Sequence, residues 1–317
     1  MILDPKTTAF LFPGQGSQAV GMGKELAEAH ATARETFREA DDQLGFRLFG
    51  LMWEGPAEEL NETINTQPAL FVHSVAALRV FNELLPGFQP AAVAGHSLGE
   101  LSALTASGAL RFPEGLALVH RRGELMKRAG EISPGGMAAI MGLDIPSLEA
   151  VCDGASRDGE IAQVANDNCP GQVVISGAKE AVSRAIEAAK AAGAKRAIPL
   201  AVSIAAHSPL MLPVQEEFKA AVLVAGISEA RIPVISNVEA SPMTAPEALQ
   251  ADVVAQLTSR VRWTESIQTL RAQGIQTFLE IGSGNVLIGL LRRIDPSARG
   301  LALGGPKDFE GLVSGSV

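Results

Sequence analysis

Short apolar runs alternate along the chain with longer segments in which apolar residues recur every three or four positions. Buried strands are predicted at 8–12 (TAFLF) and 90–95 (PAAVAG), because unbroken apolar runs of this length are typical of a parallel sheet covered on both faces. The amphipathic segments predict helices at 24–45, 67–85, about 99–108 and 113–130. The first 130 residues therefore indicate an α/β unit.

The order of elements changes after residue 132. The pattern there predicts a strand, a helix, two strands, a helix and a strand, at 137–143, 146–156, 161–166, 172–176, 179–192 and 195–203. This order is that of a ferredoxin-like unit. After residue 204 the α/β pattern of the first 130 residues returns, with a strand at 232–237 and helices at 246–258, 263–273 and 285–294. We therefore expect the small unit to be inserted in one larger α/β domain.

Ser97 occupies a special place in this pattern, between a buried strand and a helix. The segment Gly95-His96-Ser97-Leu98-Gly99 fits the nucleophile elbow, in which a serine lies on a sharp strand-to-helix turn. Side chains two residues before and after the serine would collide there, and glycines relieve the collision. The alternative is an ordinary turn with a capping serine. The flanking strand and helix favour a nucleophile, with the Leu98 amide aimed at an oxyanion.

A nucleophilic serine needs a base, and His207 is the best candidate among the five histidines. It follows a predicted strand and precedes Pro209, and reactive groups collect at strand ends in such sheets. The side chain of His96 is expected to point to the other face of the turn. No aspartate stands out as the third member of a triad, so a backbone carbonyl is an alternative partner for the histidine.

The glycine-rich loop at 12–18 (FPGQGSQ) is the candidate for a second oxyanion donor. Its glycines allow the backbone to approach a ligand closely, and the amide of Gln15 is the group we expect to donate. Such a loop could instead hold a phosphate, but it lacks the Lys-Ser/Thr of a P-loop and the spacing of a dinucleotide fingerprint.

Arg122 lies on the apolar stripe of the predicted helix at 113–130. An arginine on a buried face needs an anion, and a guanidinium binds a carboxylate through two parallel hydrogen bonds. Two interpretations remain open from the residues alone: an internal salt bridge with Asp or Glu, and a substrate carboxylate held beside Ser97.

Composition excludes several classes of function. The 317-residue chain has a net charge of −9, which argues against general nucleic-acid binding. No apolar run approaches the roughly 18 residues that span a membrane, and we expect no signal peptide. Cys152 and Cys169 have neither a metal-ligand spacing nor the pattern of a disulfide framework, so we expect a cytoplasmic protein without a metal. Two basic clusters are possible docking surfaces: Arg121, Arg122, Lys127 and Arg128, and Arg292, Arg293 and Arg299.

Several motifs together extend this interpretation over nearly the whole chain. They are FLFPGQGSQ, GHSLGELSAL, RRGELM, NDNCPGQVVISG, IAAHSPLM, VRWTESI and FLEIGSGNVLIGLLRRI. In this order they resemble the malonyl-CoA:acyl carrier protein transacylases, which are related to the acyltransferase domains of fatty acid and polyketide synthases. With this resemblance, the pattern predicts a large α/β-hydrolase-like domain at 1–132 and 204–317 and a ferredoxin-like subdomain at 133–203.

The resemblance implies acyl transfer in two steps. Ser97 attacks the thioester of malonyl-CoA, and His207 moves its proton. The phosphopantetheine thiol of an acyl carrier protein then attacks the malonyl-serine, and no cofactor is bound permanently. Arg122 would bind the malonyl carboxylate, and the amides of Gln15 and Leu98 would hold the oxyanion. In this family a main-chain carbonyl orients the histidine, and we assign it to Arg262.

One motif departs from the family pattern and keeps an alternative open. Ile204-Ala205-Ala206-His207 matches neither the sequence common in malonyl enzymes nor the YASH of methylmalonyl enzymes, and small alanines could admit an α-methyl group. We expect malonyl transfer. The alternatives are an acyltransferase for another acyl-CoA such as methylmalonyl-CoA, a serine thioesterase or hydrolase, and a carrier-protein-binding module without catalysis.

Overall fold

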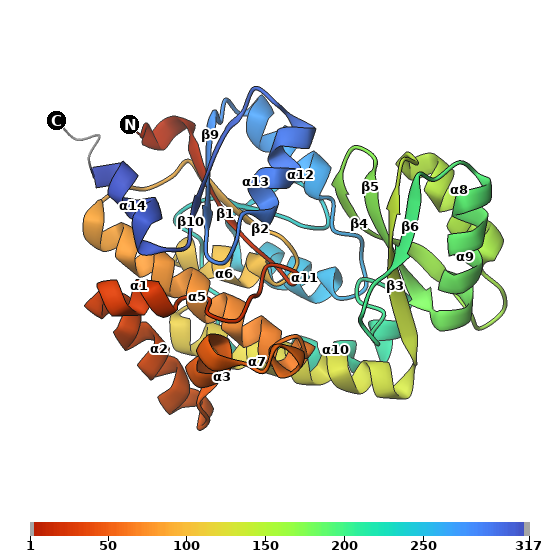
Figure 1. Cartoon of the computed structure of the whole chain (residues 1–317), viewed down its shortest axis with the longest axis horizontal. Coiled ribbons are helices and arrows are strands. Elements are labelled where there is room, and N and C mark those ends of the chain that lie inside the picture. The colour runs from red at the N-terminus through yellow and green to blue at the C-terminus, as the bar shows by residue number, and fades with distance from the viewer. Residues whose placement is uncertain (1–2, 314–317) are drawn as a thin grey trace.

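A six-stranded sheet forms the centre of the computed structural model, which describes residues 3–313 (Figure 1). Its order is β10 (Arg299–Leu303), β9 (Thr277–Ile281), β1 (Thr8–Phe12), β2 (Ala92–Gly95), β7 (Val234–Ile235) and β8 (Pro242–Met243). All neighbours are parallel except β7 and β8. The carboxyl ends of β1 and β2 therefore meet at one edge, where the loop 13–23 and the elbow both begin.

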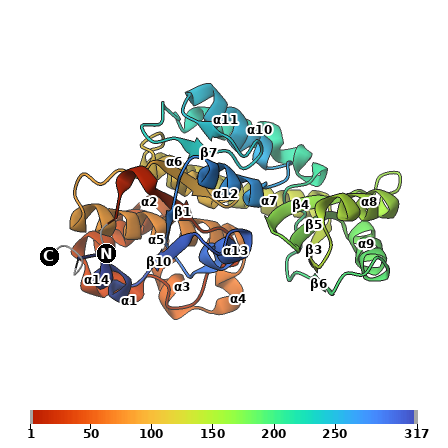
Figure 2. The ribbon, with the colours of Figure 1, turned by 90° about the horizontal axis from the view of Figure 1, so that it is seen from above.

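Helices cover both faces of this sheet (Figure 2). They are α1 (Lys24–Ala29), α2 (Ala31–Leu44), α3 (Leu48–Glu54), α4 (Ala57–Leu60), α5 (Thr63–Leu84), α6 (Gly99–Ala106), α7 (Phe112–Ile132), α10 (Leu212–Val224), α11 (Pro246–Gln256), α12 (Trp263–Ala272), α13 (Val286–Ile294) and α14 (Pro306–Val313), with short 3-10 turns η1 (Pro5–Thr7) and η2 (Pro209–Met211). Strand β1 shows why its sequence is apolar throughout. Phe10 and Phe12 point into the core under α5 and α7, and Ala9 and Leu11 into the core under α12 and α13.

A second sheet of four strands lies beside the first (Figure 1, right). Its order is β4 (Ala162–Cys169), β5 (Gln172–Ala178), β3 (Gly135–Met141) and β6 (Arg196–Pro199), and every neighbouring pair is antiparallel. The helices α8 (Ile145–Ala155) and α9 (Lys179–Ala191) pack on it around a separate apolar core. The order of elements predicted from the sequence for 137–203 is therefore confirmed.

Several element boundaries differ from the prediction. The segment 24–45 is two helices, because His30 adopts an extended backbone between α1 and α2. The strand predicted at 195–203 ends at Pro199, where pairing with β3 ends. The strand predicted at 232–237 is only Val234–Ile235. The sequence analysis did not anticipate α3, α4, α10, α14, β8 or β10.

Candidate active site

Ser97 lies on a strained turn between β2 and α6. Its φ of 50° falls in the left-handed region that residues with a Cβ rarely adopt. A Cβ added to Gly95 would collide with the backbone of Gly99, and one added to Gly99 would collide with the carbonyl of Phe12. The two glycines therefore permit the elbow for the steric reason predicted from the sequence.

The loop after β1 packs directly against this elbow. A Cβ on Gly14 would collide with the carbonyl of His96, so only glycine lets the two backbones approach so closely. Within residues 3–313, the backbone amides of Gln15 and Leu98 have no protein acceptor. Amides that are not engaged by the protein can donate to a ligand, which is what an oxyanion site needs.

His207 reaches Ser97 from the segment that follows the small sheet. The distance from Ser97 Oγ to His207 Nε2 is 2.8 Å, and His207 Nδ1 lies 2.7 Å from the carbonyl oxygen of Gln256. A carbonyl can only accept, so Nδ1 carries the proton and Nε2 is left to accept from the serine hydroxyl. The sequence prediction that brings Ser97 and His207 together matches this geometry.

The carbonyl beside His207 corrects the assignment made from the sequence, which named Arg262. Gln256 is the last residue of α11, and carbonyls in the last turn of a helix lack intrahelical partners. The carbonyl of Arg262 instead accepts from the amide and hydroxyl of Ser266 in the first turn of α12. The signal that could have identified Gln256 was the predicted end of the helix at 246–258.

Burial and charge both disfavour the protonated imidazole of His207. The residue is 3% exposed, and burial together with the neighbouring Arg122 guanidinium lowers its pKa from 6.5 to about 3. The imidazole is therefore neutral at pH 7 and able to accept a proton.

Arg122 projects from α7 into the same site and is 2% exposed. Nη1 donates to Gln67 Oε1 at 2.9 Å, and Nη2 donates to Gln256 Oε1 at 2.8 Å and to Ser97 Oγ at 3.2 Å. Within residues 3–313 no carboxylate forms a salt bridge with it. Burial lowers its pKa only to about 10, so a cation with neutral acceptors lies beside the nucleophile.

Three polar residues that the sequence analysis missed hold these groups in place. Gln67 and Gln256 contact Arg122, and the Gln256 amide also donates to the Ser97 carbonyl at 3.0 Å. Asn237 Oδ1 accepts from the Ser97 amide at 2.8 Å, while its Nδ2 donates to the Gly95 carbonyl at 2.7 Å. Nothing in their local sequence distinguishes these amides from surface residues, because their neighbours come from distant segments.

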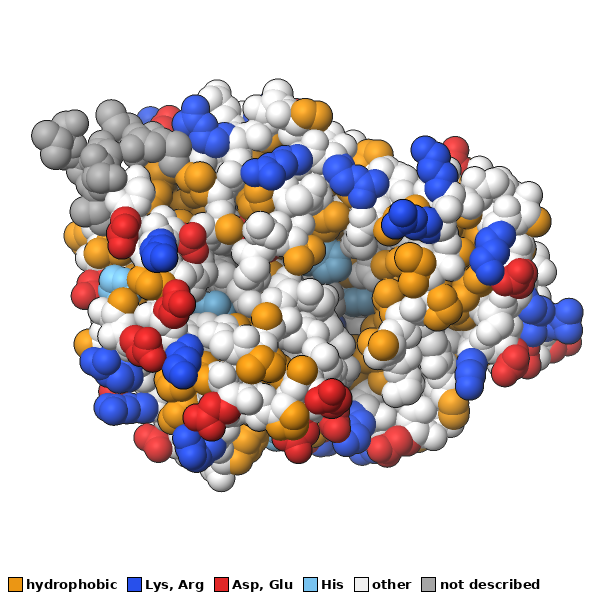
Figure 3. Space-filling view, viewed as in Figure 1, with side chains coloured by type: hydrophobic (Ala, Val, Ile, Leu, Met, Phe, Trp, Pro, Cys, Tyr) orange, Lys and Arg blue, Asp and Glu red, His pale blue; other side chains and the backbone are white. Residues whose placement is uncertain are grey.

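The small sheet borders the site through β4. Gln163 Nε2 donates to the His207 carbonyl at 2.6 Å, and His96 Nε2 lies 2.8 Å from Asn168 Oδ1 on the same strand. Figure 3 shows a hollow on this face between the two parts of the molecule, with histidine side chains visible inside it.

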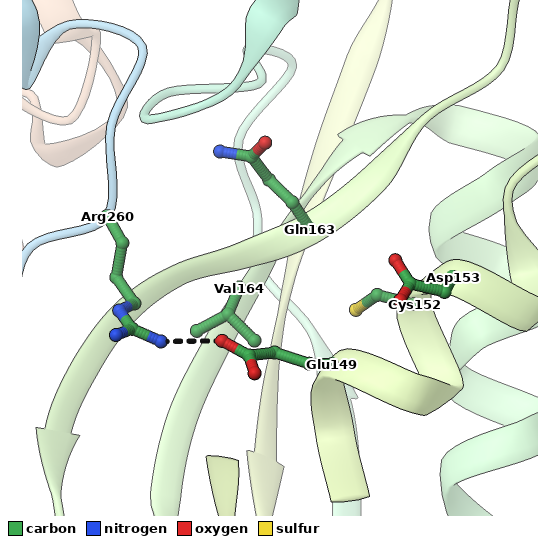
Figure 4. A pocket seen from close by; sticks show the side chains of 6 residues that line it. All are labelled: Glu149, Cys152, Asp153, Gln163, Val164 and Arg260. Atoms are coloured by element: carbon green, nitrogen blue, oxygen red, sulfur yellow. Dashed lines mark hydrogen bonds and ion pairs between the residues drawn. The ribbon is translucent and has the colours of Figure 1, made fainter. Parts of the chain in front are cut away.

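Gln163 also lines a separate cavity, together with residues of α8 and β4 (Figure 4). It is bordered by Cys152 and by an ion pair of 2.8 Å between Arg260 and Glu149. Burial raises the pKa of the Cys152 thiol to about 12, so this thiol is not a nucleophile at neutral pH. This cavity does not supply a second reactive centre.

The described residues also limit what else the molecule holds. Over residues 3–313 no group of three or more His, Cys, Asp or Glu side chains is arranged to hold a metal ion. Over the same range no helix is both long and apolar enough to cross a membrane. Cys152 and Cys169 are buried and unpaired.

Comparison with known proteins agrees with this geometry. The family model described as the acyl transferase domain matches residues 9–294. The malonyl CoA-acyl carrier protein transacylase of Bacillus subtilis is 48% identical over 302 residues, covering 95% of each chain. The acyl carrier protein S-malonyltransferase of Vibrio cholerae superposes with a TM-score of 0.92 at 43% identity, covering 96% of this chain and 99% of that one. A malonyl-transacylase solved with a type II PKS acyl-carrier protein gives 0.93 at 43% identity, covering 98% and 99%.

Proposed function

Because the chain belongs to the acyl transferase domain family, we propose that it transfers a malonyl group from malonyl-CoA to the phosphopantetheine thiol of an acyl carrier protein. The observation that carries the proposal is the buried Arg122 guanidinium, which donates to the Ser97 hydroxyl and to neutral amides. A hydrolase of uncharged acyl groups has no use for a buried cation at this place, whereas the free carboxylate of malonate is its natural partner.

In the first step, Ser97 Oγ attacks the thioester carbonyl while His207 Nε2 accepts the hydroxyl proton. The amides of Gln15 and Leu98 stabilise the oxyanion, and Arg122 holds the malonyl carboxylate. When the C–S bond breaks, His207 returns the proton to the departing coenzyme A sulfur. The products are malonyl-serine and free coenzyme A.

In the second step, the phosphopantetheine thiol takes the place of the coenzyme A thiol. His207 accepts the thiol proton as the sulfur attacks the malonyl ester, and the proton then returns to Ser97 Oγ as the C–O bond breaks. The chemistry needs no permanently bound cofactor. The acceptor places the enzyme in fatty acid or polyketide synthesis, and we propose the cytoplasm as its location.

The two sheets support a division into domains. We assign 1–132 and 204–317 to an α/β-hydrolase-like catalytic domain, because the elbow follows a strand of a parallel sheet. We assign 133–203 to a ferredoxin-like subdomain, because its strands, counted along the chain, lie in the antiparallel order two, three, one, four.

The basic clusters differ in how far other side chains neutralise them. On α7, Arg121 and Arg128 pair with Glu217, and Lys127 pairs with Glu62 at 3.5 Å. On α13, Arg292 and Arg293 are exposed, and neither has an acidic partner within residues 3–313. Carrier proteins of this kind are typically acidic, so the α13 cluster is the better docking surface.

Mass spectrometry after mixing with malonyl-CoA tests the proposed reaction. Malonyl mass should appear on Ser97 and be absent in Ser97→Ala. Ser102→Ala is the matched control, because Ser102 is buried on α6 and its hydroxyl has no hydrogen-bond partner among residues 3–313. With carrier protein in excess, the label should move to its thiol. An unlabelled wild type would refute catalysis, free malonate as the main product would indicate a thioesterase, and preference for methylmalonyl-CoA would reassign the acyl group.

A further inference from the structure

Two buried carboxyl groups lie directly behind the nucleophile, and the reaction steps above do not use them. Glu100 is in the first turn of α6, three residues after Ser97, and Asp252 is on α11. The two residues are 1% and 6% exposed, and their carboxyl groups lie within hydrogen-bonding reach of each other. Two ionised carboxylates in contact and away from water repel strongly, so this pair needs an explanation.

The available hydrogen-bond donors show what the pair lacks. Glu100 Oε1 accepts from the Asn237 amide at 3.0 Å, and Oε2 accepts from Gln256 Nε2. Asp252 Oδ1 accepts from the Ser236 hydroxyl. Asp252 Oδ2 is buried, and within residues 3–313 it has no donor. A proton between the two carboxyl groups supplies the missing partner.

The nearby charges favour one proton on the Glu100–Asp252 pair over two protons or none. Arg122 is the buried cation whose charge interacts with Glu100, and one proton leaves the pair with a single negative charge, which is attracted to this cation without forming a salt bridge to it. Burial, followed by the neighbouring Asp252 carboxyl, raises the pKa of Glu100 well above its ordinary value.

We propose that Glu100 and Asp252 share a single proton and that Glu100 acts as a positioning residue for the acyl transfer. The proposal rests on the function proposed above. Glu100 fixes the Gln256 side chain, whose Nε2 also donates to the Ser97 carbonyl and whose Oε1 accepts from Arg122. The same residue orients His207 through its main-chain carbonyl. Through Gln256, Glu100 therefore acts on Ser97, Arg122 and His207.

Asn237 provides a second connection between Glu100 and the elbow. Glu100 accepts from the Asn237 main-chain amide, and the Asn237 side chain bonds the backbone of Ser97 and of Gly95. These bonds hold the residue whose positive φ is strained. The carboxyl pair thereby supports the strained turn from within the protein.

Two amide substitutions distinguish the protonated pair from simple packing. Asp252→Asn keeps each bond, because its carbonyl accepts from Ser236 and its NH2 donates to an ionised Glu100. Glu100→Gln places its NH2 group against a donor in either orientation, the NH2 of Gln256 or the main-chain amide of Asn237. We expect Asp252→Asn to keep kcat within about threefold of the wild type. Glu100→Gln should lower kcat by about 10- to 100-fold for malonyl-CoA and acetyl-CoA alike, with smaller changes in KM.

Infrared spectroscopy tests the proton without relying on activity. At neutral pH, the spectrum of the wild type minus that of Asp252→Asn should contain the carbonyl band of a protonated carboxylic acid. Glu280, another buried acid, is unchanged in both proteins and cancels. Absence of the band would overturn the shared proton even if acyl transfer is confirmed. A wild type that forms no acyl-enzyme but shows the band would refute the function and with it the positioning role.

The kinetic result has its own contrary outcomes. A normal kcat in Glu100→Gln, or equal losses in both variants, would overturn the positioning role. Circular dichroism and thermal unfolding establish that each variant is folded. If Glu100→Gln does not fold, Asp252→Asn decides the question, since a large loss of kcat in a folded Asp252→Asn contradicts the proposal.

Discussion

Replacing Arg122 with alanine is the most direct test of how the site selects its acyl group. The guanidinium is 2% exposed and lies 3.2 Å from Ser97 Oγ, so a carboxylate next to the ester carbonyl can reach it. Each hydrogen bond to a charged group contributes about 1.5–3 kcal/mol. Two parallel bonds to the malonyl carboxylate then correspond to about 3–6 kcal/mol, or a loss of about 10²- to 10⁴-fold in kcat/KM.

Acetyl transfer provides the internal comparison for Arg122→Ala. Acetyl has no carboxylate, and removing the cation beside His207 makes the base stronger, so acetyl transfer should be retained or raised. The assay is acyl-enzyme formation from malonyl-CoA and acetyl-CoA under matched conditions. Arg121→Ala is the control, because its side chain is 41% exposed and pairs with Glu217. Equal losses for both acyl groups would show that Arg122 is structural and would refute the reasoning.

Two further predictions follow from buried titratable groups. Because the pKa of His207 is lowered to about 3, its imidazole stays neutral as the pH falls, and kcat/KM for malonyl-CoA should show no acid limb near 6.5. In Arg122→Ala, the acid limb measured with acetyl-CoA should move to higher pH, because the variant lacks the cation that helps to lower the His207 pKa. A wild-type acid limb near 6.5 would contradict the prediction. Glu280 is 0% exposed and accepts from the Leu287 and Ile288 amides, and burial raises its pKa from 4.5 to about 7. Between these values the folded state binds more protons than the unfolded state, so this group lowers stability as pH rises. Measured by urea unfolding, the free energy of unfolding of Glu280→Gln relative to that of the wild type should increase by about 3 kcal/mol between about pH 5 and about pH 8. A difference between the two proteins that does not change with pH would contradict this prediction.

Local pattern predicted much of the fold. The run TAFLF is apolar at every position because β1 is buried on both faces, and the predicted strand–helix order at 137–203 is the observed one. The strand predicted at 232–237 is longer than the observed β7, and the edge strand β10 was not predicted, since strand pairing depends on neighbours that are distant along the chain.

In the candidate site, too, some residues could be predicted from the sequence and others could not. Ser97 was identifiable because Gly95 is a local steric requirement of the elbow, since a Cβ there would collide with the backbone of Gly99. His207 was a candidate because it follows a predicted strand, where reactive groups collect, and Arg122 was a candidate because it lies on an apolar helix stripe, where an arginine needs an anion. Gln67 and Asn237 were not identifiable, because their amides gain a role only through partners at least 50 residues away.

The sequence by itself therefore predicted Ser97 as the nucleophile, His207 as its base and Arg122 as a cation on a buried helix face. The tertiary structure decided which carbonyl orients the base. It replaced Arg262 with Gln256, because α11 ends at that residue and leaves its carbonyl facing His207 Nδ1. It also placed Glu100 and Asp252 in contact, across 152 positions of the chain. A steric rule acts between near neighbours and can be read along the chain, whereas a hydrogen bond between distant segments exists only after the chain has folded.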